Sequence, residues 1–192
     1  MIYGIEYFNI AVDLEFLYPF YIKKGNIIEA IAKAISSSVS YHELFHSFQA
    51  FILNKLKEDP TIKDRDSLLT ILNNRNNLEI GASAFKVVMY YLVNGFHEDE
   101  EVYKIVRGNM LSCKDYIEDV DELKEDKYSN TYIPYNLGYC YGNIIVAKYK
   151  SSLKENIYKI IDDIVYLDEK RAIEAIKYYG DNPDELLQDK NS

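Results

Sequence analysis

Residues 41–46 read Tyr-His-Glu-Leu-Phe-His, and they lie in a run whose apolar residues recur at helical spacing. On a helix, His42 and His46 are four residues apart and lie on one face, one above the other. Two imidazoles placed in this way can bind one zinc ion, and Glu43 is then directed toward a water molecule beside the metal. The rest of the chain must supply a helical setting, a third ligand and a cleft.

The sequence after the motif continues the expected helix through Leu56. Lys55 and Lys57 suit the negative end of a helix dipole, and Pro60 marks the end of the element. Serines at 36–38 either separate this helix from the amphipathic segment 27–35 or continue one helix into the other. If they separate the two, a serine can N-cap the helix that carries the motif. The alternative interpretation of the motif is a pair of helix histidines that satisfy their hydrogen bonds without a metal.

Downstream of the motif, Glu79 stands at the start of a helix expected over 78–93, with Gly95 as a C-cap. Small residues follow it at 81–84, and they would allow this helix to approach the first one closely. The plainer explanation of Glu79 is a first-turn carboxylate that the helix dipole favours.

The pattern resembles the zincin metallopeptidases, and more narrowly the gluzincins, over roughly residues 27–94. Gluzincins carry H-E-x-x-H on one helix and a glutamate ligand on a second helix downstream. The resemblance implies that His42, His46 and Glu79 bind Zn²⁺ and that Glu43 is the general base. Several gluzincins also place an aspartate four residues after the ligand glutamate, where this chain has Ser83. The support for a ligand histidine would therefore be weaker here.

His97 is the competing third ligand, in a loop after the expected glutamate helix. It could also donate a hydrogen bond to substrate, but its position beside Glu98 and Asp99 favours a surface residue. Its spacing from His46 excludes the metzincin pattern H-E-x-x-H-x-x-G-x-x-H.

A peptidase also needs a donor for the oxyanion, and gluzincin-like enzymes commonly use tyrosine or histidine. A tyrosine-rich segment supplies the candidates, and Tyr135 and Tyr139, nearest Gly138, are preferred among Tyr132, Tyr135, Tyr139 and Tyr141. For any one of these rings, packing at the core boundary is the simpler explanation.

The remaining segments predict a single domain over residues 1–192 of class α+β, mainly α-helical. Partial alternation of aromatic and β-branched residues predicts one or two strands, and hence a small β-sheet, over residues 1–22. Other helices are expected at 67–72, 98–110, 154–166 and 168–179, with a polar loop at 73–77, a solvated helix or loop at 113–127 and an irregular segment at 128–134. Gly138 and Gly142, four residues apart, would let a helix pack closely on a neighbour. The fold expected is thus a zincin-like core with an active-site helix and a glutamate helix.

Composition restricts the partners and the compartment. The net charge of −9 argues against binding nucleic acid or anionic lipid. The acidic residues near the start argue against a signal peptide, and no apolar run reaches the length expected of a membrane span. Cys113 and Cys140 form no C-x-x-C pair, so no disulfide framework is indicated and a reducing cytoplasm is expected.

The sequence as a whole favours a zinc metallopeptidase that acts on a peptide or protein substrate. The alternative is a zinc-containing binding or regulatory protein that keeps the motif without hydrolysing peptides. A zinc enzyme with a non-peptide substrate is a third hypothesis.

Overall fold

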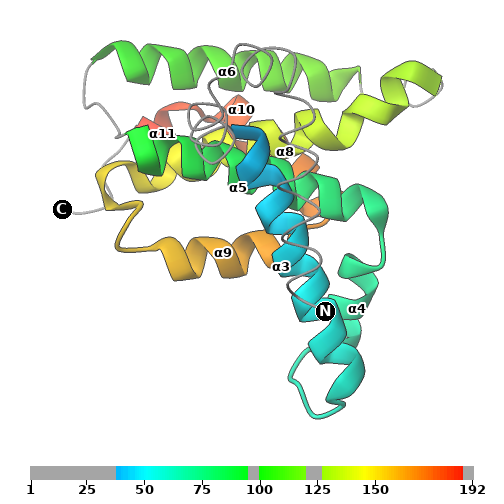
Figure 1. Cartoon of the computed structure of the whole chain (residues 1–192). Helices are drawn as coiled ribbons and strands as arrows, with labels where there is room; N and C mark the ends of the chain where they lie inside the picture. Colours follow the sequence, from blue (N-terminus) through cyan, green and yellow to red (C-terminus); the bar gives the residue numbers. More distant parts are fainter. Residues whose placement is uncertain (1–37, 95–99, 120–126, 188–192) are drawn as a thin grey trace, which may run out of the picture.

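The computed structural model describes residues 38–94, 100–119 and 127–187 of the 192-residue chain, and these residues form helices joined by short connections (Figure 1). The helices are α3 (Ser38–Glu58), α4 (Arg65–Leu72), α5 (Arg75–Asn94), α6 (Glu100–Glu118), α8 (Lys127–Tyr149), the 3₁₀ turn η2 (Lys150–Ser152), α9 (Ile157–Val165), α10 (Glu169–Asp181) and α11 (Asp184–Leu187). No helix of this described part is long and apolar enough to cross a membrane.

The expected α+β class is wrong, because these described residues contain no strand. Residues 1–22, to which the small sheet was assigned, lie outside the described ranges, as does the segment 27–35. The prediction of strands rested on β-propensity and partial alternation, and such preferences depend strongly on context.

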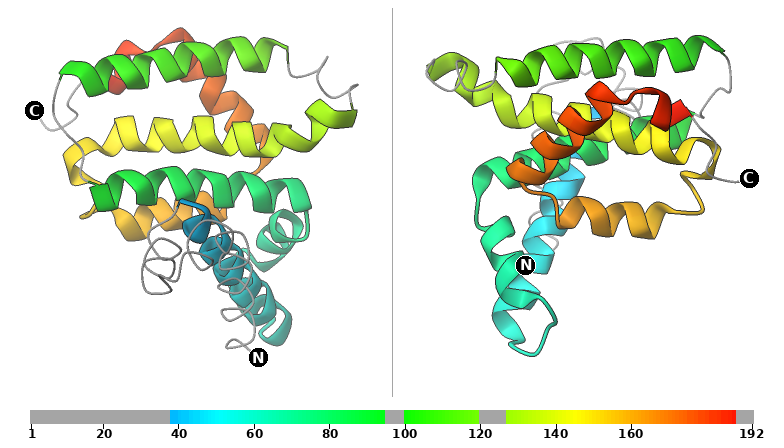
Figure 2. Two further views of the ribbon diagram at one scale, coloured as in Figure 1. Left: turned by 45° about the horizontal axis from the view of Figure 1, so that its top comes forward. Right: turned by 180° about the vertical axis from the view of Figure 1, so that it is seen from behind.

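Two long helices, α5 and α8, form the centre of the molecule, and they carry much of its buried apolar surface. Helix α6 lies on the other side of α8, so that α5, α8 and α6 form three adjacent rows (Figure 2, left). Helix α3 crosses α5 at a steep angle, and α10 packs against α6 and α8. The core is therefore built by helices on both sides of α8, with α3 attached to the outer side of α5.

Glycines let α5 and α8 pack in close contact, as their spacing predicted. A Cβ atom on Gly138 would clash with the carbonyl oxygen of Ile80 and would lie 2.5 Å from the Cβ of Ser83. A Cβ on Gly142 would lie 2.7 Å from the Cβ of Val87. Because later residues of α8 face later residues of α5, the two helices run in the same direction. The start of α8 therefore lies beside the start of α5.

Helix boundaries agree with the sequence at α3, α4, α9 and α10 to within a few residues. Helix α5 begins at Arg75, inside the expected polar loop 73–77, because the side chain of Asn74 caps it. The Oδ1 of Asn74 accepts hydrogen bonds from the backbone N–H of Asn76 at 2.9 Å and of Asn77 at 3.4 Å. Helix α6 continues beyond the expected 98–110 to Glu118.

The expected irregular segment 128–134 is wrong, because α8 runs through Pro134. A proline inside a helix removes one backbone hydrogen bond and crowds the preceding turn. Buried neighbours on both sides, Ile133 and Leu137, anchor this part of α8 to the core. Tertiary packing therefore overrides the local signal of the proline.

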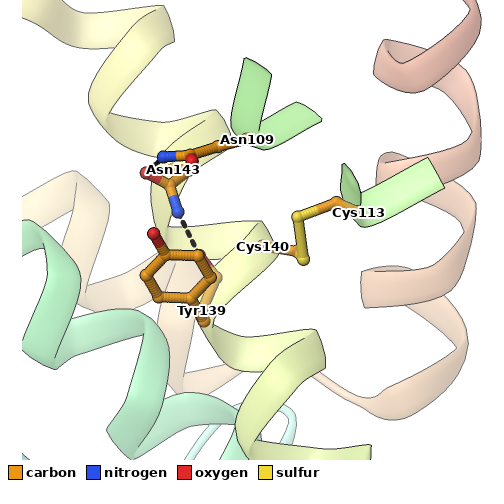
Figure 3. Close-up of a disulfide and its surroundings, with 5 residues drawn as sticks. All are labelled: Asn109, Cys113, Tyr139, Cys140 and Asn143. Atoms are coloured by element: carbon orange, nitrogen blue, oxygen red, sulfur yellow. Dashed lines mark hydrogen bonds between the residues drawn. A yellow bond between two sulfur atoms is a disulfide. The ribbon is translucent and has the colours of Figure 1, made fainter. Parts of the chain in front are cut away.

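A disulfide joins Cys113 of α6 to Cys140 of α8, with the two Cα atoms 5.8 Å apart (Figure 3). The expectation of no disulfide is wrong, because helix packing brings together two cysteines that are 27 residues apart. Nearby, Asn109 of α6 donates a hydrogen bond to Asn143 of α8 at 3.3 Å, and Asn143 donates one to the carbonyl of Tyr139 at 2.9 Å. The expectation of a reducing cytoplasm rested on the cysteine pattern and loses that support.

Candidate metal centre

Helix α3 presents His42 and His46 toward α5, one turn apart on the same face. His42 is buried and His46 is half-buried, and their ring centroids lie 4.7 Å apart. The helix can turn this face inward because Phe45, between them in sequence, is buried and stacks on Phe85 of α5 at 4.7 Å. The apolar contact therefore anchors the segment that carries both imidazoles.

Helix α5 brings Glu79 to the two histidines. Its Oε2 lies 3.1 Å from the Nε2 of His42 and 3.3 Å from the Nε2 of His46. The two Nε2 atoms are themselves 3.1 Å apart. Three potential ligand atoms from two helices thus converge on one point.

Gly81 allows α5 to approach α3 closely, because its missing side chain would point toward α3. A Cβ atom at this position would lie 2.9 Å from the Nε2 of Gln49 and 3.3 Å from the ring of Phe45. A larger residue would push the two helices apart and separate Glu79 from the histidines. The small residues at 81–84 serve contacts with two helices. Gly81 faces α3, Ala84 faces α8, and Ser83 lies against both, close to Gly138 of α8 and to His42 of α3.

The outer nitrogens of both rings have partners, which directs the Nε2 atoms toward the common point. The Nδ1 of His46 lies 2.9 Å from the Oε1 of Gln49, and Gln49 donates its own N–H to the carbonyl of Leu78 at 3.1 Å. The Nδ1 of His42 lies 3.5 Å from the hydroxyl of Ser83, which is a long contact. Gln49 was not singled out from the sequence, where the available signal was only a glutamine three residues after His46 within an apolar helix.

The geometry fits a metal ion. Ligand atoms at about 2.0–2.2 Å from a tetrahedral zinc ion lie roughly 3.3–3.5 Å from one another, and the three distances measured here are close to that spacing. Two imidazoles and one carboxylate form a set used at catalytic zinc sites, which leave the fourth position for water or substrate. The donor atoms present therefore suit Zn²⁺.

Without a metal, the three groups influence one another's protonation. Hydrogen bonds with His42 and then His46 hold the pKa of Glu79 far below its ordinary value. Burial lowers the pKa of His46, but its contacts with Glu79 and Gln49 outweigh burial, and the net effect raises this pKa. The cluster is thus electrostatically organised around an ionised carboxylate.

A hollow of about 410 Å³ opens on one side of the cluster, and the general-base candidate Glu43 lines it together with His42 and Ser83. Tyr135 and Tyr139 of α8 also line it. The ring of Tyr135 stacks on that of His42 at a centroid distance of 5.7 Å. Burial and then the nearby Glu79 carboxylate raise the pKa of Tyr135, so its hydroxyl stays protonated at neutral pH.

A second hollow, of about 370 Å³, is lined by His46 and Glu79 and shares no lining residue with the first. The three candidate ligands are thus divided between two hollows, with His42 lining the first.

The other candidates from the sequence lie elsewhere. Tyr132 is exposed and lines neither hollow. Tyr141 lines neither hollow, and burial and then the charge of Asp163 on α9 raise its pKa. His97 lies outside the described residues.

Comparison with protein-family models, curated proteins and solved structures finds no match to this chain. The functional argument consequently rests on the geometry of the site.

Proposed function

We propose that this chain is a zinc-dependent metallopeptidase, with His42, His46 and Glu79 as the metal ligands. One observation carries the proposal. Three ligand atoms converge at zinc spacing beside a hollow that also holds a carboxylate, Glu43, and a tyrosine hydroxyl, Tyr135. This set provides a Lewis acid site, a base and a hydrogen-bond donor in one place.

A bound zinc ion would polarise the scissile carbonyl and lower the pKa of a water molecule at the site. Glu43 would take the proton from that water and deliver it to the leaving amine. Its position in the sequence, directly after the ligand His42, turns it toward the hollow on the reacting side.

Tyr135 would donate a hydrogen bond to the carbonyl oxygen as negative charge develops there. Its stacking on His42 and its closeness to Glu79 place it at the edge of the metal cluster. Tyr139 lines the same hollow one turn later and would contact the substrate chain. Both rings are partly exposed, which leaves them accessible to a ligand.

The test combines metal analysis with hydrolysis of a broad peptide panel. We expect about one zinc per purified chain, and loss of zinc in His42→Ala and Glu79→Ala. Glu43→Gln should retain the metal and lose roughly 10²–10⁴-fold in hydrolysis, the range for a general base. Tyr135→Phe should also retain zinc and lower the rate constant for turnover.

Absence of zinc together with an unaltered metal content in His42→Ala would reject the metal site. Zinc binding without any hydrolysis, in the parent as in Glu43→Gln, would favour the second candidate, a zinc-binding protein that does not cleave peptides. The long contact between Ser83 and His42 is the observation that supports this second candidate.

A further inference from the structure

The second hollow, beside His46 and Glu79, has a mostly aliphatic wall made by Leu53, Leu72 and Leu78. These side chains come from α3, α4 and α5, and the exposed Arg75, the first residue of α5, also lines the hollow. The hollow therefore offers apolar surface close to the metal ligands and one positive charge.

Arg75 is the first residue of α5 and lies one helical turn before Glu79, on the same face. Arg75 and Glu79 line the same hollow, so the positive charge lies beside the candidate ligands although the side chain is exposed.

Arg75 differs from the other arginines of the chain, each of which has a partner. Arg65 donates to the carbonyl of Leu56, Arg107 pairs with Asp184, and Arg171 donates to the carbonyl of Tyr166. Within the described part of the chain, the guanidinium of Arg75 has neither a hydrogen bond nor an ion pair. In a chain of net charge −9, a guanidinium beside the site with no partner among the described residues suits a ligand carboxylate.

We propose that Arg75 and the aliphatic hollow form a subsite that binds a peptide residue with an aliphatic side chain and a neighbouring carboxylate. The carboxylate is either the α-carboxylate of a C-terminal residue or the side chain of an acidic residue that follows. This inference rests on the proposed peptidase function and extends it to the substrate class. The aliphatic side chain fills the hollow, and the guanidinium forms a charge-assisted hydrogen bond with the carboxylate.

The test measures binding of hydroxamate ligands to the zinc-loaded full chain by calorimetry. A short linker joins the hydroxamate, which binds zinc, to leucine with a free carboxylate or to leucine amide. A second pair carries leucyl-glutamate amide or leucyl-glutamine amide, and a third ligand replaces leucine by glycine. Hydroxamates are used because thiol ligands could reduce the disulfide.

We expect one charged ligand to bind roughly 10- to 100-fold more tightly than its neutral partner, as a hydrogen bond to a charged group predicts. Preference within the first pair identifies a C-terminal carboxylate, and preference within the second identifies an acidic side chain. Arg75→Gln should abolish the preference, and Lys177→Gln, which removes an exposed charge on α10, should retain it. Glycine in place of leucine should weaken binding by about tenfold or more.

Equal affinities within both pairs for the parent, a preference that persists in Arg75→Gln, or no binding of any ligand would overturn the subsite. The outcome is independent of turnover. Hydrolysis without a charge preference would leave the peptidase proposal standing and reject the subsite. A charge preference without hydrolysis would support the subsite and reject the peptidase proposal.

Discussion

Gln49 determines which nitrogen of His46 is available to a metal. Its Oε1 accepts from the Nδ1 side of the ring, and its amide N–H is itself fixed by the carbonyl of Leu78 on α5. The proton is thereby held on Nδ1, and the Nε2 lone pair faces Glu79 and His42. A residue outside the motif thus orients a ligand inside it.

Gln49→Leu should lower zinc affinity by about 10–100-fold, because leucine has a similar size but cannot fix the ring. Affinity is measured by competition with a chromogenic chelator. Asn54→Leu, an exposed change on the same helix, serves as the control and should bind zinc as the parent does. Parental affinity in Gln49→Leu would show that the contact with His46 has no influence on the metal.

The charges in the cluster predict opposite pH trends for the metal-free and zinc-loaded chains. Because the pKa of His46 is raised above its ordinary value of 6.5, its contribution to stability is present below that pH and is lost as the pH rises through the raised pKa. The lowered pKa of Glu79 affects stability only in acid. Its stabilising contribution is complete above the ordinary pKa of 4.5 and is lost as the pH falls below that value. Zinc competes with the proton on His46, so zinc binding strengthens over the same rise in pH.

Thermal unfolding of both forms between about pH 6 and 8 checks these trends. The metal-free chain should lose stability as the pH rises, because His46 loses its proton. The stabilisation by added zinc should increase over the same range. In Glu79→Gln the metal-free trend should be smaller, because the main partner of His46 is gone. A zinc effect that is constant across the range would contradict the assignment of His46 as a ligand.

At the scale of elements, the position of Tyr135 depends on the contact between α5 and α8. Gly138 and Gly142 let the backbone of α8 approach Ile80 and Ala84 directly. This contact places the start of α8 next to the start of α5 and thereby Tyr135 next to Glu79. The close packing of small residues is thus a requirement of the site as well as of the core.

Gly138→Ala should destabilise the protein by about 1–3 kcal/mol, because the new methyl group meets the backbone of α5, which cannot move aside cheaply. The matched control is Gly108→Ala on α6, where an added Cβ meets nothing within 4 Å. That change should be neutral or stabilise by roughly 0.5–1 kcal/mol through helix propensity. Chemical denaturation measures both, and equal effects of the two substitutions would contradict the packing argument.

The sequence identified the elements of the site better than those of the fold. His42, Glu43 and His46 were proposed because their relation is local to one helix, and Glu79 because it matches the gluzincin pattern, with the small residues after it as support. The structure brings His42, His46 and Glu79 together. Gln49 and the disulfide were missed, since each depends on how helices pack. The class α+β was wrong for the described residues, since propensity was the only signal for strands, and the segment 1–22 to which they were assigned lies outside the described ranges. The irregular segment before Pro134 was wrong because buried neighbours hold it in a helix.

At the scale of the whole molecule, the disulfide between Cys113 and Cys140 is a cross-link between α6 and α8 that closes a loop of 27 residues. In the unfolded chain, such a link removes conformational entropy. Its contribution is therefore independent of the metal site, whose ligands belong to α3 and α5.

Replacing both cysteines by alanine should lower the free energy of unfolding by about 3–4 kcal/mol, the value for a closed loop of this length. Denaturation of the parent and of the double variant measures this change, and reduction of the parent provides the matched control. Zinc content should remain at the parental level. A difference in unfolding free energy below about 0.5 kcal/mol would mean that the disulfide does not stabilise the folded protein.

The direct contact of α5 with α8 has a consequence for how this protein can evolve. A metal ion would tie α3 to α5, and the disulfide ties α6 to α8, but no cross-link among the described residues joins one pair to the other. The ligands belong to the first pair and the tyrosines to the second. Substitutions at the glycine contact between α5 and α8 could therefore move the tyrosines and change reactivity without changing the metal ligands. Descendants of one ancestral protein could in this way become either enzymes or zinc-binding proteins without activity.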